Sequence, residues 1–310
     1  MDRSLSGSAQ PLPGPVLAVV GPTGVGKSEL AVELALRVGG EVVNADSMQL
    51  YRGMDIGTAK LAPDQRRGVP HHLLDVWPVT RTASVADYQQ IARAAVDDVL
   101  ARGLVPVLVG GSGLYVRAVL DPLRFPGTDP ELRRRLEDEV VAVGAAALHR
   151  RLEDLDPATA DRISPANPRR IVRALEVIEL TGQRYASTLP AYRSVYAVEH
   201  IGLDREPADL DRRLEERVER MWAAGLPAEV SELADRGLRE GVTAGRALGY
   251  AQALAELSGS CSGEQARADT VRATKRFVRR QRSWFRRDPR IDWHDAARVE
   301  AAGLAPTIGR

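Results

Sequence analysis

Cysteine and long apolar runs are scarce in this sequence of 310 residues. The single cysteine, Cys261, excludes an internal disulfide and a cysteine-rich metal site, and it favours a reducing, cytoplasmic location. No apolar run approaches the roughly 18 residues that a membrane-spanning helix needs, and the polar N-terminus lacks the apolar segment of a signal peptide. We therefore expect no membrane association, a flexible leader over residues 1–14 and a cytoplasmic monomer.

Lysine is also scarce, because Lys27, Lys60 and Lys275 are the only three in the chain. Arginine supplies nearly all of the positive charge, so richness in arginine alone carries little information. The net charge is only +1, yet residues 265–290 hold ten of the 43 basic residues and two of the 42 acidic ones. The rest of the chain is therefore acidic overall, and this clustering of positive charge indicates a polyanionic partner.

Short apolar runs and one long amphipathic segment predict an α/β arrangement. Hydrophobic residues make up 44% and charged residues 27% of the chain, which excludes disorder as the dominant state. Val16–Val20 and Val105–Val109 are typical of buried parallel strands. The other predicted elements are strands over Glu41–Asn44 and Val195–Leu203 and a helix over Ala83–Arg102 with Ser84 as its N-cap.

A glycine-rich motif, GPTGVGKS, follows the first predicted strand and precedes a helical pattern. In this context the glycines let backbone N–H groups converge on phosphate oxygens, the lysine adds a positive charge, and the serine hydroxyl suits Mg²⁺. The motif therefore predicts binding of a diphosphate or of a nucleotide such as ATP, without indicating the reaction. Its residues are Gly21, Pro22, Thr23, Gly24, Val25, Gly26, Lys27 and Ser28.

The predicted fold is α/β, with a P-loop NTPase-like core on a parallel sheet, a helical insertion and a helical, basic C-terminal region. The insertion is expected where the pattern turns helical and becomes rich in arginine and glutamate. The expected division is a leader at 1–14, a core at 15–125 and 195–225, the insertion at 126–194, and a helical region at 226–310 that is basic at 265–290.

An acidic residue, Asp46, follows the second predicted strand. Ordinary ATPases and GTPases hold their metal with an acidic residue after a later core strand, but here that strand runs into Gly110, Gly111 and Ser112. We expect Asp46 to end the strand beside the phosphate loop, where it could hold Mg²⁺ or accept a proton from a nucleophile. An aspartate that only stabilises a turn is the alternative.

Several segments resemble a known family. Asp46–Lys60 (DSMQLYRGMDIGTAK) lacks periodicity and reads as a loop that lines a site, and Val107–Val119 (VLVGGSGLYVRAV) contains a glycine-rich turn. With Gly21–Ser28, they resemble the tRNA dimethylallyltransferases, also called tRNA isopentenyltransferases, over about residues 16–290. Further matching segments are Val69–Val76, Ser84–Gln89, Asp129–Arg133, Asn167–Val177, Ile201–Glu206, Asp211–Leu226, Gly245–Tyr250 and Thr274–Arg287.

The resemblance implies a magnesium-dependent transfer of a dimethylallyl group from dimethylallyl diphosphate to the exocyclic N6 amine of an adenosine. In the family this adenosine lies just 3′ of the anticodon, so the implied partner is the anticodon stem-loop of tRNA. Asp46 matches the general base of the family, and Ser112 stands where threonine is usual. The implied catalytic residues are Asp46, Ser112, Lys27 and Arg217; Arg213 would join the diphosphate site, and Ser28 would bind Mg²⁺.

The resemblance also implies contacts with tRNA, including contacts from the helical insertion. On periodicity alone, the arginines of the insertion would be solvent-exposed charge, and Trp284 could pack in the core instead of stacking on a base. The implied residues are Asp46, Ser47, Met48, Gln49, Ser112, Arg133, Arg169, Arg170, Arg173, Arg246, Tyr250, Arg279, Arg280, Gln281, Trp284 and Arg286.

Other interpretations account for parts of the sequence. A small-metabolite kinase would use the same phosphate loop but would leave the insertion and the basic stretch without a role. A prenyltransferase acting on free adenine nucleotides would not need them either. A plain RNA-binding module would require neither an intact phosphate loop nor Asp46. The adjacent His71 and His72 are expected to make structural hydrogen bonds, because no partner has metal-ligand spacing.

Overall fold

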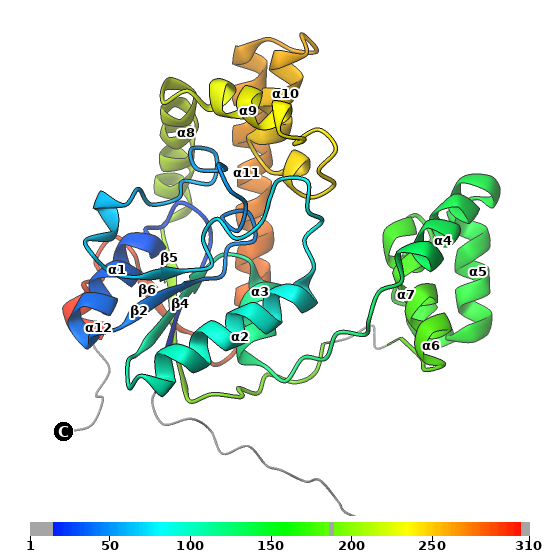
Figure 1. Ribbon diagram of the computed structural model, residues 1–310, viewed down its shortest axis with the longest axis horizontal. Coiled ribbons are helices and arrows are strands. Elements are labelled where there is room, and N and C mark those ends of the chain that lie inside the picture. The colour runs from blue at the N-terminus through cyan, green and yellow to red at the C-terminus, as the bar shows by residue number, and fades with distance from the viewer. Residues whose placement is uncertain (1–14, 186–188, 305–310) are drawn as a thin grey trace, which may run out of the picture. The chain divides into compact units, whose positions relative to one another are not determined.

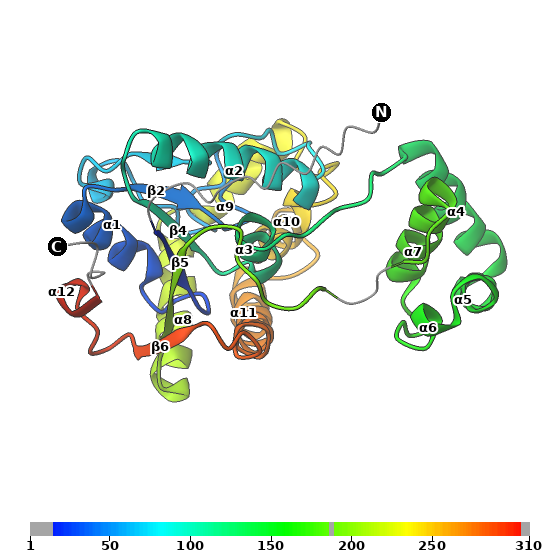
Figure 2. The same ribbon diagram turned by 90° about the horizontal axis from the view of Figure 1, so that it is seen from below.

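The computed structural model describes residues 15–185 and 189–304. These residues form two compact units, which we describe separately. The first unit comprises the described residues up to Pro122 and from Tyr192 onwards, and it contains the sheet (Figures 1 and 2). The second unit spans Leu123–Ala191 and is helical; the predicted insertion was 126–194.

A parallel sheet forms the centre of the first unit. The described residues contribute six strands in the order β3-β2-β4-β1-β5-β6, and every neighbouring pair is parallel (Figure 1). The predicted α/β fold class is therefore confirmed. The strands are β1 (Val16–Val20), β2 (Glu41–Asn44), β3 (His71–His72), β4 (Pro106–Gly110), β5 (Val198–Asp204) and β6 (Asp292–Asp295).

Helices cover both faces of this sheet, which explains why its central strands are continuous apolar runs. Val16, Ala18 and Val20 of β1 pack in one apolar cluster, and Leu17 and Val19 pack in another. The first cluster includes α2 and α3, and the second includes α1 and α8 (Figure 2). These helices are α1 (Lys27–Val38), α2 (Val85–Ala101), α3 (Gly113–Leu120) and α8 (Pro207–Ala223). Ser84 caps α2, as predicted, and its side chain accepts a hydrogen bond from the N–H of Asp87.

The sheet differs from the sequence prediction at its edges and in its strand order. Strands β3 and β6 were missed, because they are short, polar and partly exposed. The predicted helical C-terminal region at 226–310 did not include β6, which pairs with β5. The expectation that the strand before Asp46 adjoins the phosphate-loop strand is also wrong, because β4 lies between β1 and β2. The charge of Asp46 nevertheless acts on Lys27 in the phosphate loop.

Helices α9, α10 and α11 group beside α8, whereas α12 lies beside α1, as Figure 1 shows. Helix α11 has 23 residues and contacts α3, α8 and α10. Among the described residues, no helix combines the length and the apolar character that crossing a bilayer requires. The remaining elements are α9 (Leu226–Asp235), α10 (Tyr250–Leu257), α11 (Gly263–Phe285), α12 (Ala301–Leu304) and the 3₁₀ turns Asp64–Arg66 and Ala244–Arg246.

The second unit is a small helical bundle with its own apolar core. Asp129, Asp156 and Asn167 each precede a proline and accept a backbone hydrogen bond, which is a favourable combination for starting a helix. Leu136 and Leu175 are fully buried between the helices. The helices are α4 (Pro130–Val143), α5 (Ala145–Leu155), α6 (Pro157–Ala160) and α7 (Pro168–Thr181).

Candidate active site

The glycine-rich motif forms the turn between β1 and α1. Gly21, Gly24 and Gly26 have positive φ angles of 138°, 88° and 99°. A Cβ atom on Gly21 would lie 2.1 Å from the carbonyl oxygen of Leu203, so only glycine fits there. Helix α1 begins directly after Gly26, and the free N–H groups of its first turn are suited to an anion. The predicted phosphate loop therefore has the conformation that phosphate binding requires.

Lys27 is the first residue of α1 and is half-buried. Its Nζ donates a hydrogen bond of 2.6 Å to the carbonyl oxygen of Pro22. Burial lowers the pKa of the Lys27 ammonium to about 8, while the charge of Asp46 opposes this shift and that of Arg217 adds to it. An anionic ligand at the loop would favour the protonated form of this lysine.

Arg213 and Arg217 of α8 reach the phosphate loop. Arg217 Nη1 donates a hydrogen bond of 2.8 Å to Thr23 Oγ1, and Arg213 Nε donates one of 3.3 Å to the carbonyl oxygen of Gly24. Burial lowers the pKa of the Arg217 guanidinium, and the charge of Asp46 raises it in part. The structure thus brings both arginines to the loop and places Arg217 within electrostatic range of Asp46.

Asp46 lies just beyond β2 and is half-buried. Its Oδ1 accepts a hydrogen bond of 2.9 Å from the N–H of Met48, and its own N–H donates one of 2.9 Å to Asn44 Oδ1. One carboxylate oxygen therefore stabilises a turn, as the alternative interpretation held. The described residues provide no hydrogen bond to Oδ2, so this oxygen is free to accept a proton.

Ser112 connects the loop after β4 to the loop after β2. Its Oγ accepts a hydrogen bond of 3.3 Å from the N–H of Ser47, and the hydroxyl oxygens of the two serines are 3.2 Å apart. Met48 and Gln49 are half-buried in the same loop, and Gln49 Nε2 donates a hydrogen bond of 3.2 Å to the carbonyl oxygen of Thr58. The loop after β2 and the loop after β4 are therefore joined through Ser47 and Ser112.

Ser28 is half-buried on the first turn of α1 and lines a small cavity with Asn44 and Gln49. Within the described residues, no group of three or more His, Cys, Asp or Glu side chains could hold a metal ion. Mg²⁺ often takes one or two protein ligands and completes its shell with water and substrate phosphates. A single serine hydroxyl in the phosphate loop therefore fits a magnesium ion that binds together with a diphosphate.

Gln281 and Trp284 lie on the face of α11 that packs against the core. Gln281 is 5% exposed, and both ends of its amide bind backbone groups inside the protein. This burial argues against the predicted contact between Gln281 and tRNA. A Cβ atom on Gly113 would lie 2.1 Å from the Trp284 ring, so this ring packs closely against the backbone of α3. The alternative prediction, that Trp284 packs in the core, is therefore correct for one side of the ring.

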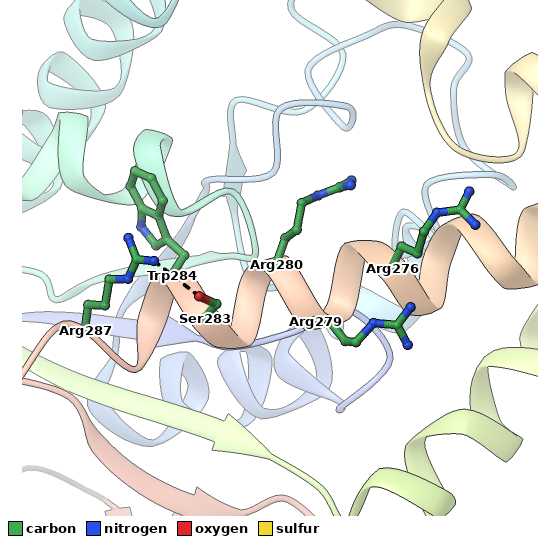
Figure 3. Close-up of a pocket in the computed structure, with 6 residues that line it drawn as sticks. All are labelled: Arg276, Arg279, Arg280, Ser283, Trp284 and Arg287. Carbon is green, nitrogen blue, oxygen red and sulfur yellow. Dashed lines mark hydrogen bonds between the residues drawn. The ribbon is translucent and has the colours of Figure 1, made fainter. Parts of the chain in front are cut away.

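Beside Trp284, α11 carries an open groove of about 570 Å³. Figure 3 shows Trp284 and Arg287 side by side at one end of the groove, with Arg276 and Arg279 toward its other end. All of these arginines are exposed, and none forms an ion pair with an acidic side chain in the described part of the chain. Arg276 and Arg287 were not among the predicted tRNA-binding residues, although Arg276 and Arg280 have the i, i+4 spacing of one helix face. The lining residues are Arg276, Arg279, Arg280, Ser283, Trp284 and Arg287.

Arg286, Tyr250 and Arg246 lie outside this groove. Arg286 Nη2 donates a hydrogen bond of 3.1 Å to Asp204 Oδ2, and its guanidinium lies over the ring of Trp293. Tyr250 is fully buried, and its hydroxyl donates a hydrogen bond of 2.6 Å to Glu229 Oε1. This burial argues against the predicted contact between Tyr250 and tRNA. Arg246 is exposed, so its side chain is accessible to a ligand.

The predicted tRNA-binding arginines of the second unit differ in their surroundings. Arg133 and Arg173 both pair with Glu176, a side chain that is fully buried. Burial alone would raise the pKa of Glu176, but hydrogen bonds from these arginines lower it overall. Arg169 and Arg170 are exposed on the first turn of α7, without an ion pair among the described residues. Arg133 and Arg173 thus stabilise the unit, and Arg169 and Arg170 are available to a ligand.

The histidine pair makes structural hydrogen bonds, as predicted. His71 Nδ1 lies 2.8 Å from the carbonyl oxygen of Val69, and His72 Nε2 lies 2.6 Å from Glu41 Oε2.

A phosphate loop at the first strand, an all-parallel sheet and an acidic residue on an early strand define a P-loop α/β protein that differs from ordinary P-loop hydrolases. The chain belongs to the IPP transferase family, whose model matches residues 49–288. It is 63% identical over 284 residues to the tRNA dimethylallyltransferase of Salinispora tropica, covering 92% of this chain and 89% of the relative. The corresponding enzyme of Streptomyces coelicolor is 63% identical over 304 residues, with 97% of each chain covered.

Solved structures agree with this assignment and confirm the family resemblance seen in the sequence. The full-length tRNA isopentenylpyrophosphate transferase of Bacillus halodurans has a TM-score of 0.69 and 40% identity, covering 94% of this chain and 93% of that one. A eukaryotic dimethylallyltransferase acting on tRNA has a TM-score of 0.77 and 25% identity, covering 91% of this chain and 74% of that one. The chain is therefore an enzyme of the tRNA dimethylallyltransferase family.

Proposed function

We propose that this chain transfers a dimethylallyl group from dimethylallyl diphosphate to the N6 amine of the adenosine 3′-adjacent to the anticodon of tRNA. The product would be N6-(dimethylallyl)adenosine. The observation that carries the proposal is the geometry of the phosphate loop, where Lys27 begins α1 and Arg217 Nη1 donates a hydrogen bond of 2.8 Å to Thr23 Oγ1. The charge of Asp46 raises the pKa of both cations, in opposition to burial. Two cations suit a departing diphosphate, and a carboxylate beside them suits the removal of a proton from an incoming amine.

In the proposed reaction, the N6 nitrogen attacks C1 of the dimethylallyl group. The C1–O bond breaks, and its electron pair leaves with the diphosphate. Asp46 Oδ2 accepts the N6 proton, and this assistance matters because an amine conjugated to adenine is a weak nucleophile. Lys27 and Arg217 stabilise the negative charge that grows on the diphosphate. Ser112, held by Ser47 beside Asp46, offers a hydroxyl to orient the adenosine.

We propose that a magnesium ion binds at Ser28 together with the diphosphate. Ser28 would hold the ion with oxygens of the diphosphate, and the ion would supply further positive charge to the leaving group. The protein contributes the hydroxyl, and the backbone N–H groups of Gly24–Ser28 orient the phosphates.

The anticodon stem-loop is the proposed macromolecular partner. The groove on α11 presents four exposed arginines to a phosphate backbone, and its tryptophan ring is partly open to a base. Arg169 and Arg170 of the second unit are further exposed cations. We also propose a cytoplasmic location, because a tRNA substrate and a single cysteine both suit that compartment.

One labelling experiment tests the proposal. The chain is incubated with Mg²⁺ and either labelled dimethylallyl diphosphate or γ-labelled ATP, with and without unmodified tRNA. We expect label to move from dimethylallyl diphosphate to tRNA and to appear on the N6-modified adenosine after nuclease digestion. Transfer of the γ-phosphate to a small acceptor would instead support a kinase, and prenylation of free AMP would support a nucleotide-acceptor enzyme.

A further inference from the structure

Gln281 bridges the two glycine-rich loops of the site. Its Oε1 accepts a hydrogen bond of 3.0 Å from the N–H of Thr23 in the phosphate loop. Its Nε2 donates one of 2.9 Å to the carbonyl oxygen of Gly111 in the loop after β4. We propose that Gln281 is a positioning residue that fixes the distance between these loops and thereby shapes the diphosphate site. This inference rests on the proposed function, in which the diphosphate binds at Gly21–Ser28.

The surroundings of Gln281 favour glutamine over other side chains. A Cβ atom on Gly111 would lie 2.4 Å from Gln281 Nε2, so the amide packs directly against the backbone of the turn. Both polar ends of this buried amide have a partner, as burial requires. Glutamate of the same length has no donor when ionised, methionine has neither a strong donor nor a strong acceptor, and asparagine is one methylene shorter.

The two loops that Gln281 joins carry the groups of the proposed reaction. Thr23 receives the hydrogen bond from Arg217, and it lies in the loop that ends at Lys27. Gly111 immediately precedes Ser112, which binds Ser47 beside Asp46. A displacement at Gln281 would therefore move the diphosphate-binding side of the site relative to the side that carries the base. Gln281 acts through these neighbours, since its side chain is 5% exposed and both ends of its amide bind backbone groups.

Two variants and a matched control test this assignment. Gln281→Met keeps the length of the side chain and loses both hydrogen bonds, whereas Gln281→Glu keeps the acceptor and loses the donor. The control is Gln265→Glu, which makes the same change of charge at an exposed position of α11, where Gln265 binds Asp269. Calorimetry with inorganic diphosphate and Mg²⁺ gives the donor-site Kd, and binding of unmodified anticodon stem-loop RNA gives the RNA Kd.

We expect the diphosphate Kd to rise about tenfold or more in Gln281→Met, because two buried hydrogen bonds that order the loop are lost. The Kd should rise at least as much in Gln281→Glu, where a buried carboxylate oxygen would face the Gly111 carbonyl beside an anion site, and should not change in Gln265→Glu. The RNA Kd should stay within about twofold in all three variants. In steady-state assays the KM for dimethylallyl diphosphate should rise with little change in the KM for tRNA, a split that general destabilisation would not produce.

Other outcomes overturn the assignment. An unchanged diphosphate Kd in a folded Gln281→Met variant contradicts it, and so does a rise in the RNA Kd alone, which would identify a direct RNA contact. Thermal unfolding establishes that each variant folds, and Gln281→Glu supplies the comparison if the methionine variant does not fold. Diphosphate binding requires no transfer of a prenyl group. A wild-type chain that binds diphosphate but leaves tRNA unmodified would therefore refute the proposed function and leave this inference intact.

Discussion

The arginine groove on α11 leads to a quantitative prediction about RNA binding. Its four arginines are exposed and have no acidic partner in the part of the chain that the structure describes, so their charges are free to neutralise phosphates. Replacing all four by glutamine removes the charges but keeps much of each aliphatic stem, which limits the loss of packing. The substituted residues are Arg276, Arg279, Arg280 and Arg287.

The size of the effect follows from counterion release. Each phosphate contact with single-stranded RNA contributes about 0.7 to the slope of log K against log salt concentration. Four lost contacts should therefore flatten the slope by about 3. At about 0.1 M salt, each contact raises the logarithm of the association constant by roughly 0.7. The loss of four contacts should therefore lower RNA affinity roughly 10²–10³-fold. Binding of inorganic diphosphate should be spared, because that ligand sits on the phosphate loop.

A control set of four arginines on α8 and α11 removes the same charge from ion-paired positions. The anisotropy of a labelled, unmodified anticodon stem-loop is measured at several KCl concentrations for both variants. The control should change the slope by less than about 1, because each of its arginines already has an acidic partner. Equal slopes for the two variants would refute the reasoning and make the groove an ordinary solvated helix face. The control residues are Arg212, Arg220, Arg267 and Arg272.

Three further predictions concern catalysis, phosphate binding and acid stability. Asp46→Asn should lower kcat about 10²–10⁴-fold with little change in RNA affinity; near-normal turnover in single-turnover assays would remove Asp46 from the mechanism. Lys27→Ala should raise the calorimetric Kd for inorganic diphosphate about tenfold or more, since a charge-assisted contact is lost, and an unchanged Kd would contradict this role. Hydrogen bonds from Arg102 and His72 lower the pKa of Glu41 from 4.5 to about 2, so this carboxylate stabilises the fold above pH 4.5 and loses that effect as the pH falls toward 2. The Tm difference between wild type and Glu41→Gln should therefore be largest near neutral pH and shrink below pH 4.5. A difference that does not change with pH would show that the ionised Glu41 carboxylate does not stabilise the fold.

The sequence predicted the elements whose signals are local. Val16–Val20 and Val105–Val109 are apolar runs because helices cover both faces of the sheet, and the glycine motif follows the first run directly. Strand β6 (Asp292–Asp295) has the sequence DWHD and lies at an edge of the sheet, so it has no apolar run to reveal it. Its strand character comes from pairing with β5, which is a property of the tertiary fold.

Strand order and burial limit how much of the candidate site the sequence can predict. No spacing in the sequence shows that β4 separates β1 from β2, or that the loops after β2 and β4 meet through Ser47 and Ser112. Tyr250 and Gln281 lie in motifs that the family resemblance assigned to tRNA contact, yet the fold buries both side chains. A motif therefore indicates that a residue matters to the site, and only the packing distinguishes contact with a ligand from support of its neighbours.

The scarcity of lysine gains a physical meaning in the structure. Lys60 has a side chain that is 3% exposed, and its Nζ donates to Asp55 and Asp75 at 2.5 and 2.6 Å and to the carbonyl oxygen of Tyr51 at 3.1 Å. A compact ammonium with three donors suits these converging oxygens, whereas the planar guanidinium of arginine is larger and directs its donors in one plane. Lys27 likewise directs a point charge into a narrow loop, while Lys275 pairs at the surface with Asp211 and Glu215, where arginine would also serve. In a chain that uses arginine almost everywhere, two of the three lysines thus stand where the surrounding oxygens suit a compact ammonium, and both lie in segments that build the candidate active site.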